Sequence, residues 1–336
     1  MVSPDFIQSL KNILDSNHKF VIISHKNPDG DALGSSLAWL AYLKSKRKSA
    51  YFISPTYYTE SLSWMPQTED IVVYEDYKTK KHATNILNSA DVIFCLDFNA
   101  VSRLDELGEL VKASPAKKIM IDHHQMPEDF ADLTFSDTSY GATAEMIFTV
   151  LDELGEIDKI SPAVATNLYT GIATDTGFFQ FSNTTPRIHS YVGRLLALGV
   201  DPAFVSDQIN STFRDERLHY FGYLLHQKLK VVNNGTVAYI FITEKEAKDF
   251  HILLGENESL VNYPFKIKGI KVSVLFSEEK GMIKISFRSK EKYDVNDFAR
   301  KYFNGGGHIN AAGGKSLDSI EETEKKFISL MPEIFN

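Results

Sequence analysis

Aspartate and histidine residues gather in four short segments of this 336-residue chain. Six of them are candidate metal ligands: His25, Asp29, Asp31, Asp97, His123 and Asp175. Carboxylate oxygens with a few imidazole nitrogens form a donor set that suits Mn²⁺ or Mg²⁺. A single ion cannot use all six donors and still leave a position open for chemistry. The set therefore indicates two ions that share a bridging carboxylate.

Each of these segments also has a structural interpretation. Asp31 could cap a helix, and an aspartate such as Asp97 is common in the turn after a strand. Three of the segments, however, directly follow apolar runs of one expected sheet: Phe20–Ile23, Val92–Leu96 and Ile119–Ile121. Because the carboxyl ends of parallel strands meet at one edge of a sheet, this joint occurrence predicts a metal centre there.

The elements that must position these residues alternate between strand and helix patterns. The strands are expected near 20–23, 50–53, 71–74, 92–96 and 119–121, and the helices near 33–41, 141–154 and 162–174. Ser161 is placed to cap the last helix, with Pro162 in its first turn. This alternation predicts an α/β fold with a doubly wound, mostly parallel sheet over residues 1–185.

The pattern changes after residue 185. Residues 186–228 are expected to form a helical connector, since they lack the Gly/Ser runs of a flexible linker. Residues 229–336 are expected to form a smaller α/β domain. Its strands are predicted near 231–232, 237–242, 272–276 and 283–287, and its helices near 295–302 and 320–330.

The composition is that of a globular protein, with 43% hydrophobic and 24% charged residues. Cys95 is the only cysteine, which excludes an intramolecular disulfide and an all-cysteine zinc site. No apolar run approaches the ~18 residues of a membrane span, and the first residues show no signal-peptide pattern. We therefore expect a cytoplasmic protein without a membrane partner.

The net charge of −8 argues against a protein that coats long duplex nucleic acid with a basic face. The charge is uneven, however. Residues 1–229 carry 29 acidic and 20 basic side chains, whereas residues 266–315 carry 5 acidic and 11 basic ones. This division favours cations bound in the first part and a small anion bound in the second. Chance surface composition is the alternative.

In this order, the four segments resemble the DHH phosphoesterase superfamily, named for the triplet seen here as Asp122-His123-His124. The segment Phe303–Gly314 (FNGGGHINAAGG) resembles the glycine-rich signature of the DHHA1 substrate domain. The segments Ser139–Glu145 and Phe287–Lys290 narrow the resemblance to the nanoRNase/pAp phosphatase branch. The resemblance covers nearly the whole chain and implies a DHH domain over 1–185 and a DHHA1 domain over 229–336.

The resemblance implies a role for each matching residue of the first domain. His25 and Asp29 would bind one Mn²⁺, Asp31, His123 and Asp175 would bind a second, and Asp97 would bridge the two. Mg²⁺ is the other candidate ion. The catalytic candidates are His124, which would assist departure of the leaving group, and Asp122, which would orient the histidines.

In the second domain, the resemblance implies that a phosphate is bound by Arg288, Ser289, Gly305, Gly306, Gly307 and His308. The glycine triplet is expected to bring backbone N–H groups close to an anion, with a helix starting just after it. A tight turn or a flexible loop is the structural alternative. Arg103 also matches a family position, although a surface ion pair explains it equally well.

The implied activity is a Mn²⁺-dependent phosphoesterase. It would hydrolyse dinucleotides (pNpN) and short oligoribonucleotides to mononucleotides, and remove phosphate from 3′-phosphoadenosine 5′-phosphate (pAp), by in-line attack of water with two metal ions. Two alternatives remain open, namely a pyrophosphatase or exopolyphosphatase and a nucleotide sensor without catalysis. The sequence leaves the oligomeric state open, a homodimer being one candidate.

Overall fold

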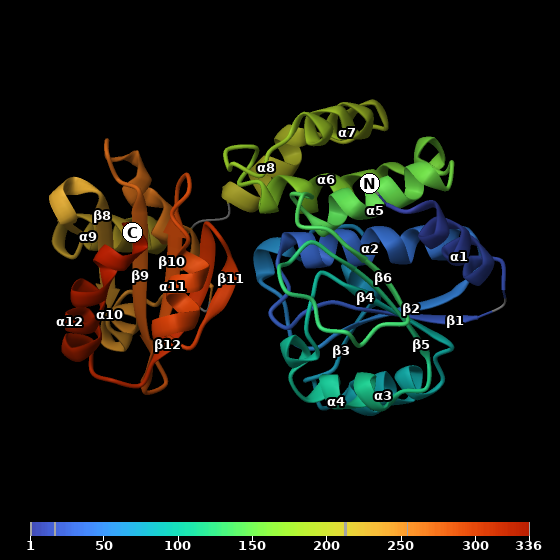
Figure 1. Cartoon of the computed structure of the whole chain (residues 1–336), viewed down its shortest axis with the longest axis horizontal. Helices are drawn as coiled ribbons and strands as arrows, with labels where there is room; N and C mark the ends of the chain where they lie inside the picture. The colour runs from blue at the N-terminus through green and yellow to red at the C-terminus, as the bar shows by residue number, and fades with distance from the viewer. Residues whose placement is uncertain (1, 17, 212–213, 254, 336) are drawn as a thin grey trace. The chain divides into compact units, whose positions relative to one another are not determined.

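The computed structural model describes residues 2–16, 18–211, 214–253 and 255–335. The chain divides into two compact units, Met1–Thr212 and Phe213–Asn336 (Figure 1). The division falls inside the segment 186–228 that was expected to connect two domains. The expected end of the first domain at residue 185 and the expected start of the second at residue 229 remain predictions.

The first unit is built on a six-stranded parallel sheet in the order β3-β2-β1-β4-β5-β6. Its strands are β1 (Lys19–Ile23), β2 (Ser49–Ser54), β3 (Ile71–Val73), β4 (Val92–Leu96), β5 (Lys117–Asp122) and β6 (Leu133–Ser136). Five of the six coincide with predicted apolar runs. The sequence pattern missed β6, a four-residue edge strand with a single buried residue, because such a short segment carries little periodicity.

Helices cover both faces of this sheet (Figure 1). One face packs against α1 (Pro4–Leu14), α2 (Gly30–Ser45), α5 (Thr143–Glu153) and α6 (Pro162–Asp175), and the other against α3 (Lys80–Asn88) and α4 (Glu106–Ala113). Successive residues of a strand point to opposite faces. In β4, Phe94 and Leu96 therefore belong to the first core, and Ile93 and Cys95 to the second. The predicted doubly wound α/β fold is confirmed.

The unit is completed by α7 (Pro186–Ala197) and α8 (Pro202–Asn210), of which α7 packs on α5 and α6.

The 3₁₀ helices in the described part of the chain are η1 (Glu60–Leu62), η2 (Thr68–Asp70), η3 (Val101–Leu104), η4 (Ile157–Lys159), η5 (Asn233–Gly235), η6 (Glu258–Lys266) and η7 (Met331–Phe335). Among the helices that the structure describes, we find none with both the length and the apolarity needed to cross a lipid bilayer.

Helices α2 and α6 approach each other unusually closely, and glycines allow this. A Cβ on Gly34 of α2 would lie 2.5 Å from the carbonyl oxygen of Asn167 in α6. A Cβ on Gly171 of α6 would lie 2.9 Å from Oδ1 of Asp31. The close packing brings the N-terminus of α2, which carries Asp31, beside the C-terminus of α6, which ends at Asp175.

The second unit contains a six-stranded mixed sheet in the order β11-β12-β10-β9-β8-β7. Its strands are β7 (Lys230–Val232), β8 (Val237–Ile242), β9 (Val272–Glu279), β10 (Met282–Ser289), β11 (Gly306–His308) and β12 (Ala311–Ser316). Its helices are α9 (Asp215–Gln227), α10 (Glu244–Asp249), α11 (Val295–Tyr302) and α12 (Ile320–Leu330). Phe287 packs with α11 and α12 on one face, whereas Ile240 packs with α9 on the other. The smaller C-terminal α/β region is thus confirmed.

Candidate metal centre

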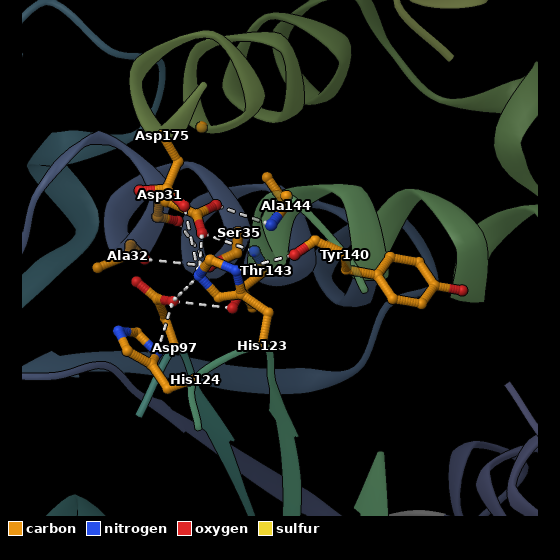
Figure 2. Close-up of polar contacts among 12 residues, drawn as sticks. Asp31, Ala32, Ser35, Asp97, His123, His124, Tyr140, Thr143, Ala144 and Asp175 are labelled. Carbon is orange, nitrogen blue, oxygen red and sulfur yellow. Dashed lines mark hydrogen bonds and ion pairs between the residues drawn. The ribbon is translucent and has the colours of Figure 1, made fainter. Parts of the chain in front are cut away.

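The candidate ligands of the first unit meet at the carboxyl edge of its sheet. Figure 2 shows four of them, Asp31, Asp97, His123 and Asp175. His25 follows β1, Asp97 follows β4 directly, and His123 follows β5. Two helices supply the others, since Asp29 and Asp31 lie at the start of α2 and Asp175 is the last residue of α6. Asp29 is the residue that caps α2, because its Oδ1 accepts hydrogen bonds from the backbone N–H groups of residues 31 and 32.

Asp97 lies at the centre of this cluster and is 2% exposed. Its Oδ1 is 3.5 Å from Nε2 of His123, and its Oδ2 is 3.4 Å from Nε2 of His25. The backbone of Asp97 is left-handed, with φ 64°, a conformation that aspartate tolerates better than most residues. Each oxygen of one buried carboxylate therefore faces a different histidine.

Each histidine completes a separate group of donors. Nε2 of His123 lies 3.7 Å from Oδ2 of Asp31 and 3.4 Å from Oδ2 of Asp175. Figure 2 draws both contacts as dashed lines. Nε2 of His25 lies 3.9 Å from Oδ2 of Asp29. Two ligands at right angles on an ion with bonds of ~2.1 Å are about 3 Å apart, so these spacings are close to those of a divalent metal site.

The second ring nitrogen of each histidine in this region meets an acceptor. Nδ1 of His25 donates to the carbonyl oxygen of Lys26 at 2.7 Å, and Nδ1 of His123 donates to that of Tyr140 at 3.2 Å. These contacts direct Nε2 of each ring toward the carboxylates, and in the neutral imidazole this nitrogen carries the lone pair. An imidazole presented in this way is suited to bind a metal ion.

Asp31 is held by the N-terminus of α5, on another part of the chain. The cap residue of α5 is Ala142, whose side chain cannot accept the helix's first N–H groups. The carboxylate of Asp31 accepts them instead, from Thr143 at 2.6 Å and from Ala144 at 2.8 Å (Figure 2). The hydroxyl of Thr143 also donates to Oδ1 of Asp97 at 2.8 Å. Helix α5 thus orients two of the carboxylates.

Burial and neighbouring carboxylates raise the pKa of two carboxylates in this cluster, Asp31 and Asp175. Burial, together with the charges of Asp97 and Asp175, raises the pKa of Asp31 well above its usual range. Burial raises the pKa of Asp175 to about 7, although His123 opposes this. Burial also acts to raise the pKa of Asp97, but the contacts with His123 and His25 outweigh it and hold this pKa well below its usual range. Such a concentration of buried negative charge is the environment that divalent cations neutralise, so the donor set fits two ions.

His124 lies beside this cluster and is oriented by Asp122. Its Nδ1 donates to Oδ1 of Asp122 at 2.7 Å, and its backbone N–H donates to Oδ2 of the same carboxylate, which is fully buried. Burial lowers the pKa of His124, although Asp122 acts to raise it. The histidine is thus held rigidly at the edge of the donor cluster.

Arg103 is half-buried and lies close enough to His25 and His124 to act on the pKa of both. Among the described residues, no carboxylate forms an ion pair with its guanidinium. The structure therefore offers no support for the surface ion pair that the sequence left open.

In the second unit, two of the predicted substrate residues face the same side of the sheet. Arg288 of β10 and His308 of β11 both pair with Ala311 of the intervening strand β12. Directly paired residues of antiparallel strands point to the same face. Both side chains are half-buried. A guanidinium and an imidazole thus lie two strands apart on one face.

Comparison with known proteins finds relatives that match this chain over most of its length. The family model described as "DHH family, N-terminal domain" matches residues 19–172, and the "DHHA1 domain" model matches residues 234–336. The proteins named bifunctional oligoribonuclease and PAP phosphatase NrnA of Thermus thermophilus and Bacillus subtilis are each 31% identical to it. The matches cover 93% and 91% of this chain and 89% and 91% of those proteins. The chain belongs to the DHH family.

A solved member resembles this DHH protein throughout. The crystal structure of an exopolyphosphatase-related protein from Bacteroides fragilis is 37% identical and superposes with a TM-score of 0.94, covering 100% of this chain and 99% of that one. The membership confirms the predicted superfamily and a phosphoesterase class of enzyme. Residues Asp122-His123-His124 lie within the part of the chain that the DHH model matches.

The glycine-rich segment of the DHHA1 domain corrects one expectation. No helix follows the triplet Gly305-Gly306-Gly307, which instead leads into the hairpin of β11 and β12. The N–H groups of Gly305 and Gly307 are also engaged, with the carbonyl oxygen of Ala299 and with Oδ1 of Asn296. A Cβ at either glycine would overlap the backbone of β12, so close strand packing explains these glycines.

Ser289 has a supporting position in the same region. It is 8% exposed, and its hydroxyl donates to the carbonyl oxygen of Tyr293 at 2.6 Å and accepts from the Asn310 amide at 2.8 Å. The hydroxyl is thus engaged within the DHHA1 domain and holds together the loops on either side of it.

Sequence reasoning overlooked the residues that hold the ligands. Thr143 and Ala144 were noted only as part of a family segment, and Asn183 and Arg187 were not singled out. Asn183 donates to the carbonyl oxygens of Gly141 and Asp175, at 3.0 and 3.1 Å. The absence of a capping side chain at Ala142, where the helix pattern begins, is the one signal in the sequence that points to a distant cap for this helix.

Proposed function

We propose that this protein is a Mn²⁺-dependent phosphoesterase that hydrolyses dinucleotides and short oligoribonucleotides to mononucleotides and removes the phosphate of pAp. The observation that carries the metal-dependent part is the position of Asp97, a buried carboxylate that faces His25 and His123 with separate oxygens. The substrate class rests on the names of the relatives that match this chain over nine-tenths of its length.

In this proposal, His25 and Asp29 would hold one cation, Asp31, His123 and Asp175 would hold the other, and Asp97 would serve both. Such cations would supply water activation and charge neutralisation for in-line displacement at phosphorus. Mn²⁺ is favoured over Zn²⁺ because the six donors are four carboxylates and two imidazoles without a thiolate. Mg²⁺ is the second ion to test.

Other residues of the chain act on the substrate in this proposal. His124, fixed by Asp122, lies at the phosphate and assists departure of the leaving oxygen. Arg103 contributes a positive charge near the same phosphate. In the DHHA1 domain, Arg288 and His308 bind a further phosphate or carboxylate of a short substrate. Two residues on one small sheet face suit a short ligand better than a long duplex.

The test is a substrate panel with Mn²⁺, Mg²⁺ or chelator, in which products are separated by chromatography. The panel contains a 5′-phosphorylated dinucleotide, a five-residue oligoribonucleotide, pAp, pyrophosphate and polyphosphate. Polyphosphate belongs in it because the 37%-identical relative is described as exopolyphosphatase-related. We expect nucleoside monophosphate from the first two substrates and phosphate from pAp.

Two outcomes would overturn the proposal. Release of phosphate from polyphosphate or pyrophosphate alone would assign the enzyme to inorganic substrates. Tight binding of a dinucleotide with Mn²⁺ but without any product would support a sensor without catalysis.

A further inference from the structure

A partly buried ion pair joins α5 to α7 close to the metal centre. Glu145, in the first turn of α5, is fully buried, and its Oε1 accepts a hydrogen bond from Nε of Arg187 on α7 at 2.6 Å. Neither residue belongs to the candidate ligands. Burying a charged pair costs desolvation free energy, so a role beyond general stability is worth examining.

Both partners of the ion pair also form hydrogen bonds with the loop that precedes α5. Oε2 of Glu145 accepts from the N–H of Gly141 at 2.7 Å, and Nη2 of Arg187 donates to the carbonyl oxygen of Ser139 at 3.0 Å. The guanidinium of Arg187 lies 3.7 Å from the ring centroid of Tyr140. One ion pair therefore contacts residues 139–141 at three successive positions, through the backbone of Ser139 and Gly141 and through the ring of Tyr140.

This loop and the first two residues of α5, together called the 139–144 loop, touch the metal centre at several points. The carbonyl oxygen of Tyr140 accepts from Nδ1 of His123, and residues 143 and 144 hold Asp31 and Asp97 through the hydrogen bonds shown in Figure 2. Asn183 links the carbonyl oxygen of Gly141 to that of Asp175. The position of the loop thus affects four of the six candidate ligands.

The loop also has no room to move toward α7. A Cβ on Gly141 would lie 2.7 Å from Cδ1 of Ile188 and 2.8 Å from the carbonyl oxygen of Asn183. Glycine allows the loop to press against these groups, and the ion pair keeps it there. A loop packed this closely transmits a displacement to the ligands instead of absorbing it.

We propose that Glu145 and Arg187 are positioning residues, which set the affinity of the centre for its cations by fixing the 139–144 loop. This inference rests on the proposed metal-dependent function in one respect: it takes the six candidate residues to be metal ligands. Groups that orient metal ligands typically change metal affinity or activity 10–100-fold when they are removed.

The same two helices provide a matched control. Arg194 of α7 forms a bidentate ion pair with Asp152 of α5, with both distances 2.8 Å, and lies over the ring of Phe148. This pair also ties α5 to α7, but none of its described contacts reaches the loop or a candidate ligand. Removing this pair shows how the loss of an ion pair between the two helices, by itself, affects Mn²⁺ affinity and stability.

The experiment titrates the metal-free, full-length protein with Mn²⁺ and follows free Mn²⁺ by electron paramagnetic resonance. Wild type, Arg187→Met, Glu145→Gln and Arg194→Met are compared, and the unfolding temperature of each is measured without metal. We expect Arg187→Met and Glu145→Gln to weaken Mn²⁺ binding about tenfold or more. Arg194→Met should lose comparable thermal stability and bind Mn²⁺ as wild type does.

Unchanged Mn²⁺ affinity in Arg187→Met would overturn the inference, as would an equal loss of affinity in Arg194→Met. If Glu145→Gln fails to fold, Arg187→Met decides alone, since its partly exposed side chain is less demanding to replace. Failure of wild type to bind Mn²⁺ would instead refute the proposed metal dependence. The two failures are therefore distinguishable.

Discussion

The two units hold their candidate functional residues in different ways. In the first unit, Asp31, Asp97 and His123 are at most 5% exposed, and each is held by groups from other elements. In the second, Arg288 and His308 are half-buried on two strands that flank β12 in a small sheet. Cation binding needs several charges held at one point before the ion arrives, whereas residues that bind a diffusing substrate must stay accessible.

The largest effect is expected from Asp97→Ala, which removes the carboxylate that both histidines face. Activity should fall by about 10³-fold or more, since a preorganised electrostatic group is lost. Mn²⁺ should raise the unfolding temperature of wild type but not that of the variant, because a ligand stabilises only the state that binds it. Activity assays and thermal unfolding with and without Mn²⁺ measure both.

Asp207→Ala, at an exposed position on α8, is the control for the loss of an aspartate and should behave as wild type. Retained activity in Asp97→Ala would rule out a bridging role for this carboxylate. It would also remove the main difference drawn between the two units, which is that the first binds cations and the second binds substrate.

His124→Ala separates chemistry from metal binding within the first unit. The variant should lose about 10²–10⁴-fold in kcat, the usual contribution of a positioned proton donor or acceptor. Its Mn²⁺ affinity should stay close to that of wild type, because His124 is placed with the substrate and not with the cations. Steady-state kinetics and Mn²⁺ titration check these two expectations. An unchanged kcat would argue against the proposed role.

Arg288→Ala tests the second unit. A hydrogen bond to a charged group contributes about 1.5–3 kcal/mol, so KM for a dinucleotide should rise roughly 10–100-fold. The effect of Mn²⁺ on the unfolding temperature should not change. Lys292→Ala, an exposed basic residue nearby in the sequence, is the matched control. Equal effects of both substitutions would indicate general attraction by the basic segment instead of a specific contact.

The smallest effect concerns stability in the second unit. Partial burial acts to raise the pKa of Glu246, but the Lys228 ammonium, the Thr243 cap and the Tyr223 hydroxyl outweigh it and lower the pKa to about 2. The ionised form therefore stabilises the fold above the usual carboxyl pKa, and this contribution is lost as pH falls toward 2. Glu246→Gln should lower stability at pH 7 by about 1 kcal/mol, the typical loss for a helix cap.

Thermal unfolding between pH 7 and pH 2 measures this effect, with Glu244→Gln on the same helix as control. The variant should lose less stability than wild type as the pH drops below about 4.5. An identical pH profile for wild type and Glu246→Gln would contradict the assignment of the low pKa.

Much of the first unit could be predicted because its strands are continuous apolar runs. Phe20–Ile23 and Val92–Leu96 are buried on both faces, which leaves a clear pattern in the sequence. The strands β11 and β12 were missed because glycine and alanine carry no strand periodicity. The same glycines suggested an anion-binding turn and a helix, whereas their main requirement is the close approach of two strands.

The sequence by itself determined the donor chemistry and the edge of the sheet where it gathers. Side-chain type is written in the sequence, and the ends of parallel strands must meet. Only the tertiary structure decided how the donors are held. Ala142 indicates that its helix lacks a local cap but not that Asp31 supplies one, and nothing local links Glu145 to Arg187, 42 residues away. Such contacts depend on how helices pack, and many sequence patterns permit the same packing.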